Sequence, residues 1–97
     1  MTLTLGIVAF VQAKPGKEAD VEAFVKAGRG IVEGEPGTRV WYGFRVDDST
    51  FGIFDAFEEE SGREAHLNGA VARGLSDNAD LFAEPPAIEP VDVLAAK

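Results

Sequence analysis

The chain has 97 residues, with 17 acidic and 9 basic side chains that give a formal net charge of −8, one histidine and no cysteine. This length fits a single domain spanning residues 1–97. The composition excludes disulfide frameworks and cysteine metal or redox sites, and one histidine argues against a zinc or iron centre. The negative charge argues against binding of nucleic acid or of anionic membrane surfaces.

The first half of the chain predicts a strand, a helix and a turn. Residues 3–13 alternate apolar side chains at period two, and Val8 and Phe10 make the second face apolar as well. A strand that is apolar on both faces is expected to be covered on both sides. Residues 17–33 then carry one apolar stripe at helical spacing: Val21, Phe24, Val25, Gly28, Ile31 and Val32. The turn-forming residues 34–37 end this helix.

The middle of the chain predicts a hairpin. Residues 38–46 and 50–57 are rich in β-branched and aromatic side chains, and residues 47–49 supply turn chemistry between them. Large apolar groups occur on both faces of these strands as well.

The second half predicts another helix and a last strand. Ser61 and Glu64 have the spacing of a capping box at the start of this helix. Its expected buried stripe is Leu67, Ala70, Val71, Gly74 and Leu75. Ser76-Asp77 is expected to cap a short further turn, Pro85-Pro86 ends the helical region, and residues 88–95 form the strand.

The resulting order β-α-β-β-α-β predicts an α+β protein of the ferredoxin-like, split βαβ type, with an antiparallel sheet and two helices on one face. The second sheet face, also apolar, then needs a partner. A homodimer that packs sheet against sheet is the simplest way to cover it. No segment approaches the roughly 20 apolar residues of a membrane span, and no Lys or Arg precedes the N-terminal apolar run, so we expect a cytoplasmic protein without membrane contact.

Two titratable residues are candidates for acid–base chemistry. His66 is either a general acid/base or a boundary histidine of an amphipathic helix. Asp55 lies within an apolar strand, where a carboxylate must find hydrogen-bond donors. Because the second helix returns over the sheet, we expect Asp55 to pair with Arg63 or with His66, as part of a site or as a structural ion pair.

Aromatic side chains of the hairpin are candidates for ligand binding. The set consists of six aromatic residues: Trp41, Tyr42, Phe44, Phe51, Phe54 and Phe57. They are expected either to line a cavity for a flat aromatic ligand or to form ordinary core.

Short motifs in this order resemble a known family. They are Lys14-Pro15-Gly16-Lys17, Glu35-Pro36-Gly37-Thr38, Phe57, Ala65-His66-Leu67, Pro85-Pro86 and the terminal Val91-Asp92-Val93-Leu94. Together they resemble the antibiotic biosynthesis monooxygenase (ABM) domain family, including its quinol monooxygenase-like members, over nearly the whole chain.

The resemblance implies a dimeric α+β barrel and a monooxygenase that oxidises a small phenolic, quinol or polyketide-like aromatic substrate with O2. No flavin, haem or metal cofactor is implied, because the electron-rich substrate itself reduces oxygen. By position, His66 matches the helix histidine of the family, Asp55 stands where an acidic residue is common, and Phe57 stands where the family often has Trp. We expect His66 and Asp55 to be the catalytic residues. With Phe57, the residues Trp41, Tyr42 and Arg63 are the expected substrate contacts.

Alternatives within the same resemblance stay open. The chain is alternatively a non-catalytic dimer that binds a small molecule or serves as an accessory protein. An isomerase relative would need a basic phosphate pocket, for which only Arg39, Arg45 and Arg63 are candidates. Haem degradation is disfavoured, since that branch needs a histidine later in the second helix than His66.

Overall fold

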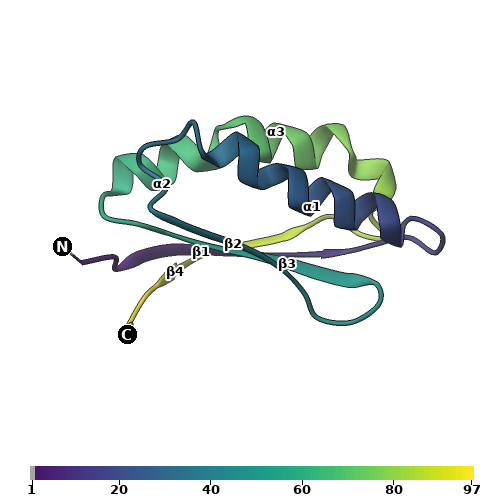
Figure 1. Cartoon of the computed structure of the whole chain (residues 1–97), viewed down its shortest axis with the longest axis horizontal. Helices are drawn as coiled ribbons and strands as arrows, with labels where there is room; N and C mark the ends of the chain where they lie inside the picture. Colours follow the sequence, from purple (N-terminus) through teal and green to yellow (C-terminus); the bar gives the residue numbers. More distant parts are fainter. Residues whose placement is uncertain (1) are drawn as a thin grey trace.

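Four strands and three helices follow the predicted order in the computed structural model, which describes residues 2–97. The elements are β1 (Leu5–Gln12), α1 (Glu18–Val32), β2 (Val40–Arg45), β3 (Thr50–Phe57), α2 (Glu60–Leu67), α3 (Ala70–Asp77), the 3-10 turn η1 (Ala79–Leu81) and β4 (Ala87–Asp92). The strands pair antiparallel in the order β2-β3-β1-β4. All helices lie on one side of this sheet (Figure 1). The predicted ferredoxin-like α+β fold is therefore confirmed.

The core lies between the sheet and the helices. Period-two alternation turns Ile7, Ala9 and Val11 of β1 and Phe51, Ile53 and Phe57 of β3 toward the helix layer, where each is buried. The helices contribute buried side chains to the same core: Val21, Val25, Val32, Val71 and Leu75. β1 and β3 are the two central strands of the sheet.

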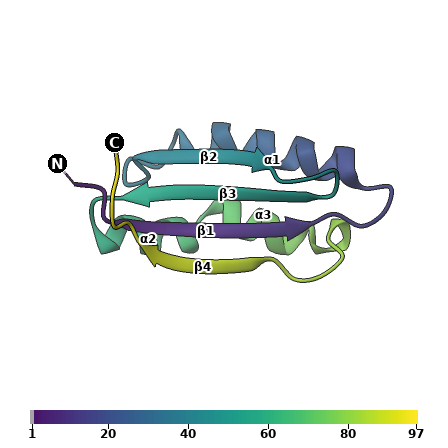
Figure 2. The same cartoon turned by 90° about the horizontal axis from the view of Figure 1, so that it is seen from below.

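The other sheet face is apolar and open. Seen from below, no helix of residues 2–97 covers the strands (Figure 2). Phe10, Tyr42 and Phe44 are 42%, 62% and 36% exposed, and the rings of Phe10 and Phe44 meet edge to face at 6.1 Å. The strands are thus apolar on both faces, as predicted. We call this surface, which also includes the half-buried Val8 and Phe54, the open face.

The predicted capping box of the second helix is wrong. α2 begins at Glu60, with Glu59 in the N-cap position and no side-chain cap hydrogen bond, so Ser61 already lies inside the first turn. The charge of Glu60 near the positive end of the helix dipole takes the place of a cap.

The second helix is also interrupted, where the sequence predicts one continuous helix. Asn68 Nδ2 donates to the Glu64 carbonyl oxygen at 2.9 Å, and the backbone N–H of Gly69 donates to the His66 carbonyl oxygen at 3.0 Å. These bonds satisfy the last carbonyls of α2, so the chain turns and restarts as α3. Val71 is buried as predicted, whereas Leu67 is exposed.

A third predicted helix signal fails after α3. Neither Ser76 nor Asp77 caps η1, whose N-cap position is held by Asn78 without a side-chain cap hydrogen bond. Asn78 Nδ2 instead donates back to the Gly74 carbonyl oxygen at 2.8 Å.

No helix within residues 2–97 has the length and apolar composition needed to cross a membrane. The cytoplasmic location expected from the sequence stays a prediction.

Candidate active site

The imidazole of His66 lies between two carboxylates. Its Nδ1 is 2.7 Å from Oε1 of Glu35, and its Nε2 is 2.8 Å from Oδ2 of Asp55. Three separate segments supply these groups: the last turns of α2, the loop after α1, and the middle of β3. The fold thus brings together side chains that are far apart in the sequence, and we call them the Glu35–His66–Asp55 cluster.

Asp55 reaches the cluster because of strand alternation. It shares the helix-facing side of β3 with Ile53 and Phe57, and it is directly opposite Ile7 of β1 and Trp41 of β2. Its side chain has no solvent exposure. A carboxylate in such a place is costly unless positive charge or hydrogen-bond donors surround it, and His66 is the nearest such group.

Glu35 reaches the cluster because its loop packs tightly on α2. A Cβ added to Gly37 would come within 2.8 Å of the Gly62 Cα, so the two backbones touch. Thr38 Oγ1 donates to Glu35 Oε1 at 2.8 Å and fixes the carboxylate. Glu35 is not recognisable as a site residue from the sequence, because only this long-range packing brings it to His66.

The cluster favours the imidazolium form of His66. Burial by itself lowers the pKa of His66, but the contacts with Asp55 and Glu35 and their negative charges outweigh burial and raise that pKa above its ordinary value of 6.5. The ring of Phe57, which is fully buried, lies 5.5 Å from the imidazole and shields it from water.

Asp55 keeps unused capacity to accept hydrogen bonds. Its Oδ2 forms an ion pair with Nε2 of His66 at 2.8 Å. Within residues 2–97, neither Asp55 oxygen has a hydrogen-bond partner. Buried polar atoms are rarely left so, and an exception points to a missing ligand or water.

A small apolar cavity lies beside this carboxylate. It has a volume of about 30 Å³ and is lined by Asp55 and His66 together with apolar side chains that include Ile7, Ile53 and Val71. Space of this size holds one water molecule or one small functional group. We call it the inner cavity.

The geometry of the cluster does not suit a metal ion. The two carboxylates meet opposite edges of the imidazole ring, so they cannot share one ion with the same nitrogen. The part of the chain that the structure describes contains no group of three or more side chains placed to hold a metal.

Of the two pairings expected for Asp55, the structure forms the one with His66. Arg63 instead donates to the carbonyl oxygens of Gly6 and Val91, both at 3.3 Å, and pairs with Glu60. It ties α2 to β1 and β4 at the sheet edge.

The other residues predicted to contact substrate differ in whether the fold brings them to the cluster. Phe57 touches His66, as described above. Trp41 is the cross-strand neighbour of Asp55 and has a buried indole Nε1 without a partner among residues 2–97. Tyr42 belongs to the open face, since it alternates with Trp41, and the structure does not bring it to the cluster.

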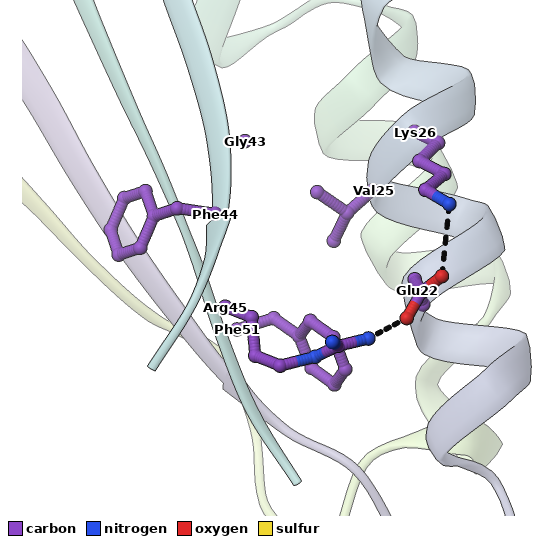
Figure 3. Close-up of a pocket in the computed structure, with 7 residues that line it drawn as sticks. All are labelled: Glu22, Val25, Lys26, Gly43, Phe44, Arg45 and Phe51. Carbon is purple, nitrogen blue, oxygen red and sulfur yellow. Dashed lines mark hydrogen bonds and ion pairs between the residues drawn. The ribbon is translucent and has the colours of Figure 1, made fainter. Parts of the chain in front are cut away.

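A second cleft, between α1 and β2, has a volume of about 250 Å³ (Figure 3). Glu22 accepts a hydrogen bond from Lys26 at 2.9 Å and also contacts Arg45, whose guanidinium lies 5.5 Å above the Phe51 ring. Phe44 points away from this cleft (Figure 3). The charged side chains of this cleft pair with one another. It therefore offers a ligand no unpaired buried carboxylate of the kind that Asp55 provides.

Comparison with solved structures finds a close relative. The NE2512 protein of Nitrosomonas europaea, described as a protein of unknown function, is 44% identical, with 98% of this chain and 93% of that chain covered and a TM-score of 0.94. Comparison with protein-family models gives no match, and neither does comparison with curated proteins.

More distant structures share the fold and carry functional names. A "putative antibiotic biosynthesis monooxygenase" from Caulobacter crescentus is 20% identical, with a TM-score of 0.80 and coverage of 96% of this chain and 92% of that one. A protein of the same description from Nitrosomonas europaea is 23% identical, with a TM-score of 0.74 and coverage of 94% and 99%.

The chain therefore belongs to the same family as the NE2512 protein, and its fold is that of the ABM-like structures. The resemblance inferred from the sequence motifs is confirmed at this level.

Proposed function

We propose that the chain is a cofactor-independent monooxygenase for small phenolic or quinol substrates. The observation that carries this proposal is the fully buried carboxylate of Asp55, which has no hydrogen-bond partner among residues 2–97 and lines an apolar cavity. Beside it lies the imidazole of His66, whose pKa is raised by the two carboxylates. A ligand that satisfies this site is apolar and presents one hydrogen-bond donor, as a phenol does.

The cluster supplies acid–base chemistry in this proposal. Asp55 accepts the hydroxyl proton of the substrate, and the His66 imidazolium stabilises the phenolate that results. Glu35 keeps the imidazole charged and oriented through Nδ1. Asp55 then returns its proton to the reduced oxygen as a hydroperoxide forms.

The substrate supplies all the electrons. The phenolate passes one electron to O2, the ring radical and superoxide combine at a ring carbon, and loss of water leaves a quinone. For a simple phenol, one phenol molecule and one dioxygen molecule give one benzoquinone and one water, so the ring loses four electrons and dioxygen gains four. No step in this sequence needs a cofactor.

The structural neighbours lend support at a coarser level. Proteins of this fold carry the names "putative antibiotic biosynthesis monooxygenase" and "possible oxidoreductase", whereas the relative at 44% identity is of unknown function. Substrate and reaction in this chain rest on the chemistry of the cluster.

The isomerase alternative finds no support in the arrangement of the arginines. Each of the three candidates for a phosphate pocket contacts a glutamate, in the pairs Arg39–Glu58, Arg45–Glu22 and Arg63–Glu60. A phosphate ligand would have to displace these carboxylates, and the overall charge of −8 opposes its approach.

A panel of hydroquinones and anthrols with isotopically labelled dioxygen tests the proposal. We expect oxygen uptake faster than autoxidation, with one labelled atom in the quinone product and the other in water. If no substrate exceeds its autoxidation rate, the non-catalytic binding protein is the better description.

We further propose that two copies of the chain form a homodimer through the open face. A second copy is the natural occupant because the open face is apolar and spans three strands, and closed two-fold dimers are the commonest way in which soluble chains cover such a surface. The helix-facing cluster lies on the opposite side of the sheet, so the substrate site stays accessible in such a dimer.

A further inference from the structure

A second and larger cavity adjoins the inner cavity. It has a volume of about 480 Å³ and lies between α3, the segment 79–86 and the start of β4. Ala72, Leu75 and Ile88 line both cavities. These three side chains therefore lie at the boundary between the wide cavity and the inner cavity beside Asp55, and we call this boundary the constriction. We call the wide space the outer cleft.

The two volumes differ in what they can hold. The outer cleft is within the range of about 300–1,000 Å³ that is typical of small-molecule sites, whereas the inner cavity holds only one small group. A ligand that fills both has a broad body in the outer cleft and a narrow tip beyond the constriction.

The walls define the chemistry of each part. The outer cleft is mostly apolar: Phe82 and Leu75 are buried apolar side chains, and Pro85 and Pro86 form a stiff wall. Its polar lining residues are Lys14, Ser76 and Glu84. At the inner end the unsatisfied oxygens of Asp55 accept hydrogen bonds. The body of the ligand is thus apolar, and its tip is a donor.

We propose that the outer cleft and inner cavity together form the substrate site, and that it selects elongated phenols whose hydroxyl lies at one end of the long axis. The reactive role of the hydroxyl rests on the proposed monooxygenase function, whereas the binding mode does not. Phenols with a bulky group next to the hydroxyl cannot pass Ala72, Leu75 and Ile88 to reach Asp55.

Three small probes test this selectivity by calorimetry under anaerobic conditions. 4-Propylphenol is expected to bind, and 2-propylphenol to bind at least tenfold more weakly, because its side group lies beside the hydroxyl. 4-Propylanisole, a methyl ether without the donor, is also expected to bind at least tenfold more weakly, since it leaves Asp55 unsatisfied. Equal affinity of the three probes, or no binding of 4-propylphenol, would overturn the proposal.

Variants locate the binding site. Ala72→Leu narrows the constriction and is expected to weaken 4-propylphenol binding at least tenfold. Ala27→Leu adds the same side chain on the exposed surface of α1, outside both cavities, and is expected to leave binding unchanged. Circular dichroism and Tm establish that each variant is folded.

If Ala72→Leu does not fold, Ala79→Leu carries the test, because Ala79 is an exposed residue that lines the outer cleft. Undiminished affinity in the folded cleft variant would show that the ligand binds elsewhere.

The outcome is separable from that of the proposed function. Selective binding that Ala72→Leu abolishes, without any oxygen uptake, would keep this site and refute the monooxygenase. Oxygen uptake that Ala72→Leu leaves unchanged would refute this site and keep the monooxygenase.

Discussion

His66 gains its properties from two neighbours that act on different ring nitrogens. Glu35 contacts Nδ1 and Asp55 contacts Nε2, and both favour the charged ring. Such an arrangement fixes the position and the charge of the imidazole together. Both ring nitrogens of His66 are then occupied, so the buried carboxylate of Asp55 is the group that can still accept a hydrogen bond from a ligand.

Glu35→Gln tests the role of the outer carboxylate. Losing its negative charge should lower the pKa of His66, and losing a charge-assisted hydrogen bond should reduce the free energy of unfolding by about 1–3 kcal/mol. NMR titration of the imidazole protons measures the pKa. Glu33→Gln on the exposed end of α1 is a matched control, and an unchanged His66 pKa in Glu35→Gln would contradict the assigned role.

The pH dependence of stability follows from the same cluster. Because the pKa of His66 is raised in the folded state above the ordinary 6.5, the folded chain holds a proton that the unfolded chain loses. The stabilisation is complete below about pH 6.5 and is lost as the pH rises through the folded-state value. Urea unfolding of the wild type and of His66→Gln across this range measures it, and equal slopes in both proteins would exclude the effect.

The sequence predicts two of the three residues in the Glu35–His66–Asp55 cluster. Asp55 and His66 are recognisable because a carboxylate interrupts an apolar strand and the next helix returns over it. Tyr42 could have been excluded from the site by parity, since it alternates with Trp41 along β2. Glu35 could not be found, because its contact with His66 spans 31 residues and depends on how the loop packs on α2.

The elements that hold the cluster are joined by a backbone contact between two glycines. Gly37 precedes β2 and Gly62 lies in α2, and any Cβ at Gly37 would overlap the Gly62 Cα. We expect this contact to determine how closely Glu35 approaches His66.

Gly37→Ala is therefore expected to destabilise the fold by about 1–3 kcal/mol and to lower the pKa of His66, because the loop must move away from α2. Gly30→Ala is the control: Gly30 lies in α1 with nothing within 4 Å of the added Cβ, so a gain of about 0.5–1 kcal/mol is expected. Thermal unfolding measures both, and a neutral Gly37→Ala would show that the contact does not position the cluster.

Periodicity predicts every strand and the first helix, but it misses the interruption between α2 and α3. The apolar spacing continues through Asn68 and Gly69, so a period-based reading sees one helix. At the break, the Asn68 side chain adds a second hydrogen bond to the Glu64 carbonyl oxygen, which already accepts from the Asn68 backbone N–H. The next N–H, of Gly69, donates to the His66 carbonyl oxygen three residues back, which ends the helical pattern. The spacing of apolar residues carries no information about such local hydrogen bonds, so it cannot predict where they end a helix.

In the whole molecule, the open face is an apolar surface that a single copy of the chain leaves exposed to water. A chain of 97 residues buries a modest share of its surface, so covering Phe10, Tyr42 and Phe44 would add considerably to stability. The alternation of the strands predicts the apolar character of this face, and the homodimer expected to cover it stays a prediction.

Light scattering of Phe10→Asp tests the homodimer. The wild type is expected to have twice the chain mass at micromolar concentration, and Phe10→Asp to be monomeric, because each copy would bury an uncompensated carboxylate in the interface. Ile31→Asp is the matched control on the helix side, since Ile31 is 40% exposed and Phe10 is 42% exposed. A wild-type protein that is monomeric under these conditions would refute the dimer.

The turnover of Asp55→Asn most directly tests the role of the cluster. Asparagine keeps the shape of the side chain but cannot take a proton from the substrate hydroxyl, and general-base catalysis is typically worth about 10²–10⁴-fold. With a hydroquinone that the wild type oxidises, we expect kcat for oxygen uptake to fall at least 100-fold in folded Asp55→Asn. An unchanged kcat would contradict the assignment of Asp55 as the base.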